Sequence, residues 1–150
     1  MLLAEALARR AEAQDRLNAL KLRLAESALI QEGDAPAEDP AALLSEVAEL
    51  LQEIETLVRR INHTNAQTPF EGATLTDAIA RRDALLQARR IYTDVAQSAT
   101  VRHDRYSRSE VRFVPTVDVA QLRDMADKAS REYRQLDTKI QQINWSTQLI

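Results

Sequence analysis

Apolar side chains recur three and four positions apart over two long stretches of the chain, and this spacing constrains the fold more than any other feature. The stretches cover residues 44–61 and 122–143. Such spacing follows one face of an α-helix and, sustained over many turns, is typical of coiled coils. Only 2 of the 150 residues are Gly and 4% are aromatic, a composition that suits helices. The sequence therefore predicts an all-α fold.

The positions with this spacing form a broad stripe on the earlier segment and a broad seam on the later segment. The stripe of the earlier segment is widened by three further leucines, so we expect that face to meet more than one neighbour. The positions are Leu44, Val47, Leu51, Ile54, Val58 and Ile61, with Leu43, Leu50 and Leu57 beside them, and then Leu122, Ala126, Ala129, Tyr133, Leu136, Ile140 and Ile143.

Residues typical of helix ends divide the chain into four predicted helices within a single domain, residues 1–150. The first covers about residues 2–31, and the second begins at Pro40 after the N-cap residue Asp39. The third covers about residues 75–99, and the fourth begins near Asp118. We expect antiparallel helical hairpins that pack as an elongated bundle.

The third helix is expected to be apolar along one stripe, and the segment before it to be a loop. Polar residues that commonly cap helix ends open this loop, at residues 62–73. The stripe is formed by Ile79, Leu86, Ile91 and Val95, and the capping residues are Asn62, His63, Thr64 and Asn65.

A short extended or β element is expected near residues 108–117. Val111, Phe113 and Val117 place apolar side chains at alternate positions, and Pro115 prevents a helix from continuing there. Because an isolated strand is unstable in water, this segment needs a partner. The partner is either the 63–73 loop or the same segment of a second copy.

The charge pattern favours pairing within the protein or between its copies. Residues 101–113 contain four arginines and two acidic residues, whereas residues 32–63 contain eight acidic residues and two arginines. The whole chain has a formal net charge of -3, so a basic surface that follows a nucleic-acid backbone is not expected. We expect the arginines to meet the chain's own carboxylates, with a small external anion as the alternative.

Several polar and apolar residues are candidates for binding or for contacts between copies. Arg82 falls near an apolar stripe, where an unpaired charge is costly, so we expect it to have an acidic partner. Trp145 is expected to act as a packing anchor at the end of the last helix. The candidate ligand-binding residues are Arg81, Arg82, Arg105, Arg108, Asn62 and Asn65, and the candidate interface residues are Tyr106, Val111, Arg112, Phe113 and Trp145.

Catalytic, metal and cofactor sites are not expected. His103, Asp104 and Ser107 are close together in the sequence and include the residue types of a catalytic triad. Because His103 and Asp104 are adjacent, their side chains point in different directions, and no glycine-rich turn is present to position the serine. The chain has no Cys and 2 His, with no spacing typical of metal ligands. The cysteine-free sequence and the lack of a membrane-length apolar segment predict a cytoplasmic protein that does not bind membranes.

Four segments together resemble the septicolysin-like family of small bacterial proteins. They are RRINHTN (59–65), TLTDAIARRDAL (74–85), DRYSRSEVRFVPTVDV (104–119) and LDTKIQQINW (136–145). The resemblance covers nearly the whole chain and implies no catalytic residues. The family's name implies pore formation.

The sequence therefore predicts a non-enzymatic protein that assembles with copies of itself and serves as an interaction scaffold. The alternative is a module that binds a phosphate-bearing ligand or RNA through an arginine cluster. A third possibility is the pore-forming activity that the resemblance implies.

Overall fold

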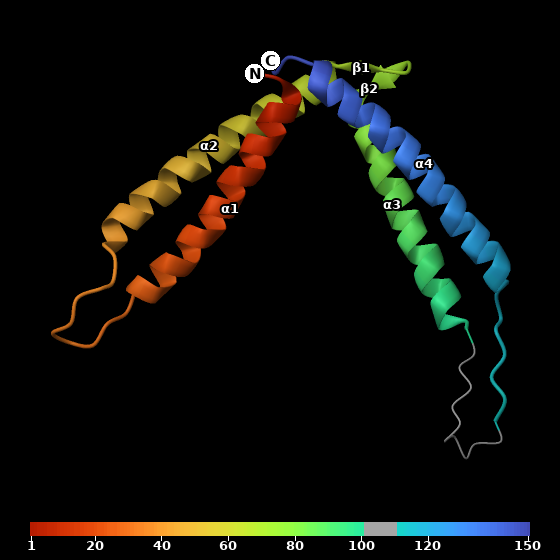
Figure 1. Ribbon diagram of the computed structural model, residues 1–150, viewed down its shortest axis with the longest axis horizontal. Helices are drawn as coiled ribbons and strands as arrows, with labels where there is room; N and C mark the ends of the chain where they lie inside the picture. Colours follow the sequence, from red (N-terminus) through yellow and green to blue (C-terminus); the bar gives the residue numbers. More distant parts are fainter. Residues whose placement is uncertain (101–110) are drawn as a thin grey trace. The chain divides into compact units, whose positions relative to one another are not determined.

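A computed structural model describes residues 1–100 and 111–150 and contains four α-helices with one small β-hairpin (Figure 1). This confirms the all-α prediction with a short β element. The helices are α1 (Leu3–Ser27), α2 (Pro40–Gln67), α3 (Leu75–Ser98) and α4 (Val119–Ser146), and the strands are β1 (Pro69–Phe70) and β2 (Ala73–Thr74).

The contacts within the chain divide it into two compact units. The first unit comprises Met1–Thr76 and Gln141–Ile150, and the second comprises Asp77–Ile140. The first contains the antiparallel hairpin of α1 and α2, and the second contains most of α3 and α4, which also run antiparallel (Figure 1). The single domain over residues 1–150 stays a prediction.

Side-chain caps start α2 and α4 where the sequence predicts. Asp39 accepts a hydrogen bond from the backbone N–H of Ala41 over 3.0 Å, and Pro40 occupies the first helical turn. Asp118 likewise accepts from the backbone N–H of Gln121 over 3.0 Å. Each carboxylate satisfies a donor that the helix leaves without an internal partner.

The second helix extends beyond its predicted end, and the first ends earlier than expected. The predicted capping residues Asn62, His63, Thr64 and Asn65 lie inside α2, which continues to Gln67. Thr64 is fully buried, and its hydroxyl donates to the backbone oxygen of Arg60 over 2.8 Å. The buried face of α2 thus continues through this polar run, which is why the prediction of a helix end was wrong.

The β-hairpin lies between α2 and α3, whereas the sequence analysis placed the β or extended element near residues 108–117. Pro69 pairs with Thr74, and Phe70 with Ala73. The intervening Glu71 and Gly72 have φ angles of 47° and 86°, as in the two-residue type I′ turn of β-hairpins. Of the extended segment, residues 111–117 lie outside any helix, but none of them forms a strand.

The core of the first unit is a seam between α1 and α2. Ala13 and Leu20 of α1 pack with Leu43 and Leu50 of α2. Both pairs are seven residues apart, the repeat of a coiled coil. The centre of the α2 stripe is therefore the set that the sequence analysis treated as its edge, Leu43, Leu50 and Leu57, all of which are buried.

The chain ends complete the first unit. The backbone N–H of Leu3 donates to the oxygen of Thr147 over 2.9 Å, and that of Leu149 donates to the oxygen of Met1 over 3.0 Å. The buried hydroxyl of Thr64 accepts from the N–H of Ile150 over 3.0 Å. These bonds hold the segment after α4 against the start of α1 and the end of α2.

The buried face of α3 differs from the predicted stripe. Its buried residues are Leu75, Ala78, Leu85 and Ala96, whereas Ile91 and Val95 of the predicted stripe are exposed. Two arginines, Arg82 and Arg89, are spaced between the buried residues and are themselves partly buried. Because charged residues interrupt the seam, its apolar pattern is difficult to read from the sequence.

The buried face of α4 follows its predicted seam more closely. Its buried apolar residues are Ala126, Ala129 and Ile140. The remaining seam residues, Leu122, Tyr133, Leu136 and Ile143, are partly buried.

Candidate functional site

The α1–α2 hairpin has two flanks that differ in charge. The seam positions recur every three or four residues along α1 and α2, as at Ala13, Leu20, Leu43 and Leu50. Residues immediately before such positions, including Arg9 and Glu53, lie on one flank of the hairpin. The two helices meet there, because Arg9 Nε lies 2.5 Å from Glu53 Oε1. We call this the charged flank. Its charged residues are Glu5, Arg9, Glu12, Arg16, Arg23 and Glu26 of α1 and Glu46, Glu49, Glu53 and Arg60 of α2.

The residues immediately after each seam position lie on the opposite side of the hairpin, which we call the neutral face. Its only charged residues are Lys21 and Glu55, and most of the others are alanine or leucine. The neutral face comprises Ala4, Leu7, Ala11, Gln14, Asn18, Lys21 and Ala25 of α1 and Ala41, Leu44, Ala48, Leu51, Glu55, Val58 and Asn62 of α2.

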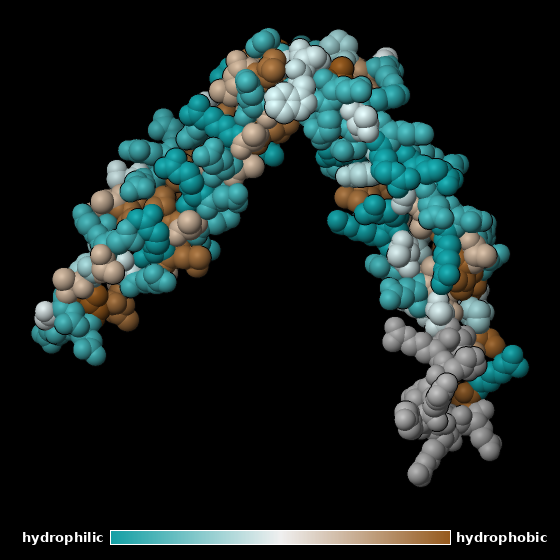
Figure 2. All heavy atoms as spheres, in the orientation of Figure 1, coloured by the Kyte–Doolittle hydropathy of each residue, from teal (hydrophilic) through white to brown (hydrophobic). Residues whose placement is uncertain are grey.

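Two leucines of the neutral face are exposed although the seam beside them is filled. Leu44 is 54% exposed and Leu51 is 51% exposed, whereas the adjacent Leu43 and Leu50 are buried. Figure 2 shows that apolar side chains reach the surface of both hairpins among hydrophilic ones. Burial of apolar surface is favourable at roughly 25 cal/mol per Å², so these leucines favour contact with another surface.

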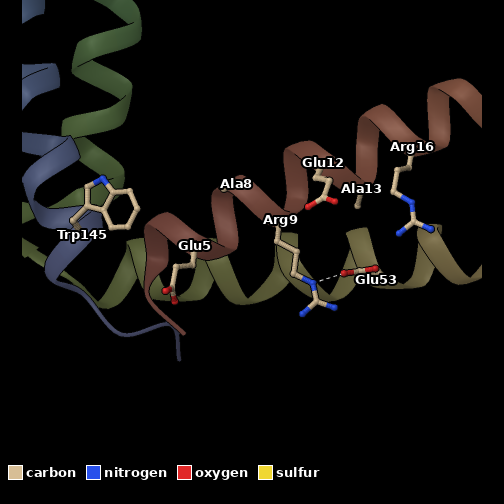
Figure 3. A pocket seen from close by; sticks show the side chains of 8 residues that line it. All are labelled: Glu5, Ala8, Arg9, Glu12, Ala13, Arg16, Glu53 and Trp145. Carbon is tan, nitrogen blue, oxygen red and sulfur yellow. Dashed lines mark hydrogen bonds and ion pairs between the residues drawn. The ribbon is translucent and has the colours of Figure 1, made fainter.

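A shallow groove of about 490 Å³ runs along the charged flank (Figure 3). Arg9 and Glu53 are joined across it, and Glu5, Glu12 and Arg16 lie along it, with Trp145 at one end. Glu5 also accepts a hydrogen bond from the backbone N–H of Leu2 over 2.6 Å, which caps α1. Carboxylates and guanidinium groups alternate along the groove and largely offset one another.

Trp145 does not anchor the end of α4 by burial. Its side chain is 62% exposed, contrary to the packing role that the sequence predicts. Its place among candidate interface residues stays a prediction.

In the second unit, arginines of α3 meet acidic residues of α4. Arg82 contacts Asp83 over 2.9 Å and Asp137 over 3.4 Å, with its side chain 25% exposed. Arg81 contacts Glu132 over 3.2 Å. The acidic partner predicted for Arg82 is therefore present, and it lies within the same chain.

Electrostatics keep the Arg82 guanidinium charged. Burial lowers the pKa of Arg82, but hydrogen bonds and charges from Asp83 and Asp137 outweigh this, so the pKa lies above its usual value. About two turns further along α3, the Arg89 guanidinium lies 5.8 Å from the ring centre of Tyr133, a cation–π contact. This contact was not predicted from the sequence, although both residues occupy regularly spaced seam positions.

The described candidate ligand-binding residues are divided between the two units. Asn62 and Asn65 belong to α2 in the first unit, while Arg81 and Arg82 belong to the second. Asn62 lines a groove of about 630 Å³ with Arg59, Arg60 and His63. Arg105, Tyr106 and Arg108, and also His103, Asp104 and Ser107, lie outside the described residues.

Of the candidate interface residues near position 111, Phe113 borders a groove. Phe113, together with Val114 and Val117, lines a groove of about 910 Å³ beside the end of α3. Phe113 is 73% exposed, and Val111 and Arg112 are exposed as well. Whether they contact another copy stays a prediction.

Residues 1–100 and 111–150 contain neither a membrane-spanning helix nor a metal-binding cluster. No helix there has both the length and the apolar character needed to cross a membrane. That same part of the chain has no group of three or more His, Asp or Glu side chains placed to hold a metal ion.

A family model described as a family of unknown function, DUF6847, matches residues 10–149. The chain belongs to DUF6847. The match to this family covers both helical hairpins.

A solved structure resembles this chain over its whole length. It is described as a functionally unknown conserved protein from Corynebacterium diphtheriae and has 53% sequence identity, with a TM-score of 0.91. The match covers 100% of this chain and 99% of the other. The comparison with curated proteins found no match.

Membership of DUF6847 corrects the resemblance to the septicolysin-like family. Neither the DUF6847 match nor the structure from C. diphtheriae points to septicolysin. The pore-forming activity that rested on this resemblance has no support.

Proposed function

We propose that this DUF6847 protein is a non-enzymatic scaffold that assembles with copies of itself in the cytoplasm. The observation that carries the proposal is the half-exposed pair Leu44 and Leu51, seven residues apart beside a filled seam. In a coiled coil, apolar residues flanking the seam favour packing of additional helices. The cysteine-free sequence accords with the reducing cytoplasm.

The energetic argument is one of exposed area. In a monomer, the leucines beside the seam remain about half exposed to water. They therefore add little hydrophobic stabilisation to a hairpin whose seam is already filled. Association with another copy removes them from water and contributes roughly 25 cal/mol per Å² of apolar area. A two-fold contact uses the same patch on both copies, so this one exposed surface can supply both sides of the contact.

The alternative, binding of a phosphate-bearing ligand or RNA through Arg81, Arg82, Arg105 and Arg108, has less support. Arg81 and Arg82 already have carboxylate partners on α3 and α4. A ligand has to displace those carboxylates or bind beside them, which lowers the attraction for an anion.

Sedimentation velocity of the full chain at micromolar concentrations tests the proposal. We expect a mass at least twice that of the 16.9 kDa chain, and a midpoint of thermal unfolding that rises with protein concentration. A single 16.9 kDa species at every concentration, with a constant midpoint, overturns the proposal.

A further inference from the structure

The neutral face carries charges and leucines in an order that is complementary to itself. The helices α1 and α2 run antiparallel with Arg9 beside Glu53, and Arg23 beside Glu38 marks the loop end of the hairpin. In this register, residue 7 of α1 is level with Glu55, residue 11 with Leu51 and residue 18 with Leu44. Toward the loop, the neutral face therefore presents Glu55, Leu51, Leu44 and finally Lys21.

These four residues are placed nearly symmetrically along the hairpin. Leu51 and Leu44 are seven residues apart, which is about 10 Å at 1.5 Å per residue. In the same register, Glu55 is level with Leu7, which precedes Lys21 by 14 residues. Glu55 and Lys21 are therefore roughly 20 Å apart along the hairpin axis. Along the hairpin axis, the midpoint of the charged pair lies within about one residue of the midpoint of the leucine pair, although Lys21 is on α1 and the other three residues are on α2.

We propose that the neutral face is the self-association surface and that a second copy of this chain packs on it in antiparallel orientation. The two-fold axis passes between Leu44 and Leu51. Each Leu44 then packs against Leu51 of the other copy, and each Lys21 of α1 lies at the same height along the hairpin as Glu55 on α2 of the other copy. This inference rests on the proposed function, because it names the surface through which the assembly forms.

The order of charges selects this orientation over the alternative. If the two hairpins pack in parallel, Glu55 faces Glu55 and Lys21 faces Lys21, and like charges repel. In the antiparallel arrangement every charge meets its opposite. Neither Lys21 nor Glu55 forms an ion pair with any residue in the part of the chain that the structure describes, so both are free for a second copy.

The small residues of the neutral face suit close packing of helices. Exposed alanines, including Ala11, Ala25, Ala41 and Ala48, surround the two leucines. Small side chains at a contact let helices approach to the lower end of the usual 8–10 Å interaxial range. The charged flank, by contrast, is lined by long Arg and Glu side chains that keep it in water.

Charge reversal tests the proposed pairing. Lys21→Glu and Glu55→Lys should each raise the dissociation constant of the assembly by about 10-fold, because each places two like-charged pairs in the contact. The double variant Lys21→Glu/Glu55→Lys restores opposite charges and should return the dissociation constant to near that of the wild-type chain. Both side chains are exposed, so circular dichroism should show unchanged helix content.

A substitution on each side of α1 provides a matched control. Ala11→Glu lies on the neutral face and Ala19→Glu on the opposite flank, and both alanines are exposed in the middle of the same helix. We expect Ala11→Glu to weaken the assembly by at least about 10-fold, and Ala19→Glu to leave it unchanged.

Disulfide formation tests the antiparallel geometry directly, since the chain has no native Cys. Lys21→Cys/Glu55→Cys should give a covalent dimer on mild oxidation with a copper–phenanthroline catalyst and oxygen, each disulfide releasing two protons and two electrons. The two positions are roughly 20 Å apart within one hairpin, too far for a bond within one chain. Ala19→Cys/Glu55→Cys is the control and should stay mostly monomeric on denaturing gels.

The outcomes separate this inference from the proposed function. A wild-type chain that is monomeric at all concentrations overturns both. A wild-type assembly that ignores charge reversal, tolerates Ala11→Glu and gives no covalent dimer overturns the inference alone, because the assembly then uses another surface.

Discussion

Arg82 shows how far one residue's surroundings can be reasoned from the sequence. Its position near an apolar stripe of α3 predicts an acidic partner, because an unpaired charge is costly when partly buried. The structure supplies Asp137, 55 residues further along the chain, as well as the neighbouring Asp83. The need for a partner follows from local spacing, but the choice of Asp137 requires the pairing of α3 with α4.

The ion pair of Arg23 with Glu38 gives a pH-dependent prediction. The hydrogen bond from the Arg23 guanidinium lowers the pKa of the Glu38 carboxyl below its usual value, which is about 4.3 for Glu. A carboxyl with a lowered folded-state pKa contributes stability above the unfolded-state pKa, and this contribution is lost as the pH falls through the folded-state pKa. Glu38→Gln should therefore lower the unfolding free energy at pH 7, and the difference from wild type should vanish in acid.

Urea unfolding of both proteins at pH 7 and below the pKa of Glu38 measures this difference. Arg23→Gln is the matched control, since it removes the donor and should return the pKa of Glu38, followed by NMR titration, toward its usual value. An unchanged pKa in Arg23→Gln contradicts the assigned cause.

The helices themselves were largely predictable, because their signals are local. Asp39 with Pro40 and Asp118 mark starts that the structure confirms. The buried sides of α2 and α3 were predicted less well. On α2, Leu43 and Leu44 each begin a series of apolar residues that recurs every seven positions. Only the packing of α1 determines that the series of Leu43 is buried.

Leu50 and Leu51 offer a direct test of the α2 seam. Leu50→Ala removes a buried side chain and should lower the unfolding free energy by about 2–5 kcal/mol. Leu51→Ala removes a half-exposed side chain from the next position and should cost the isolated hairpin much less, under about 1 kcal/mol.

Chemical denaturation at a protein concentration where the chain is monomeric measures both effects. Because both substitutions replace leucine with alanine in one helix, they share the same change in helix propensity. Equal losses from the two substitutions contradict the seam assignment.

The two units of the chain differ in what fills their seams. The first unit packs Leu20, Leu43 and Leu50 together. In the second unit, Arg82 and Arg89 occupy seam positions of α3, and the buried residues of the two helices include Ala78, Ala96, Ala126 and Ala129. Alanine buries little apolar area, so the seam of the second unit contributes less hydrophobic stabilisation.

Hydrogen exchange should reveal this difference. We expect backbone amides of residues 85–96 in the second unit to exchange faster than those of residues 43–57 in the first, because opening the weaker seam costs less free energy. Exchange measured by mass spectrometry on peptides from these two segments checks the expectation. Stronger protection in residues 85–96 than in residues 43–57 speaks against it.

The sequence by itself determined the helical class, most helix starts and the need of Arg82 for an acid, because these depend on spacing and on neighbours within a few turns. Tertiary structure alone decided which heptad set is buried, that α2 continues through Thr64, and that the β-hairpin forms at residues 69–74. It also separated the neutral face from the charged flank. The helix α2 has apolar residues on more than one stripe, and its helical spacing is the same whichever stripe is buried. Only the packing of the antiparallel helix α1 decides that Leu43 and Leu50 are buried and that Leu44 and Leu51 are exposed.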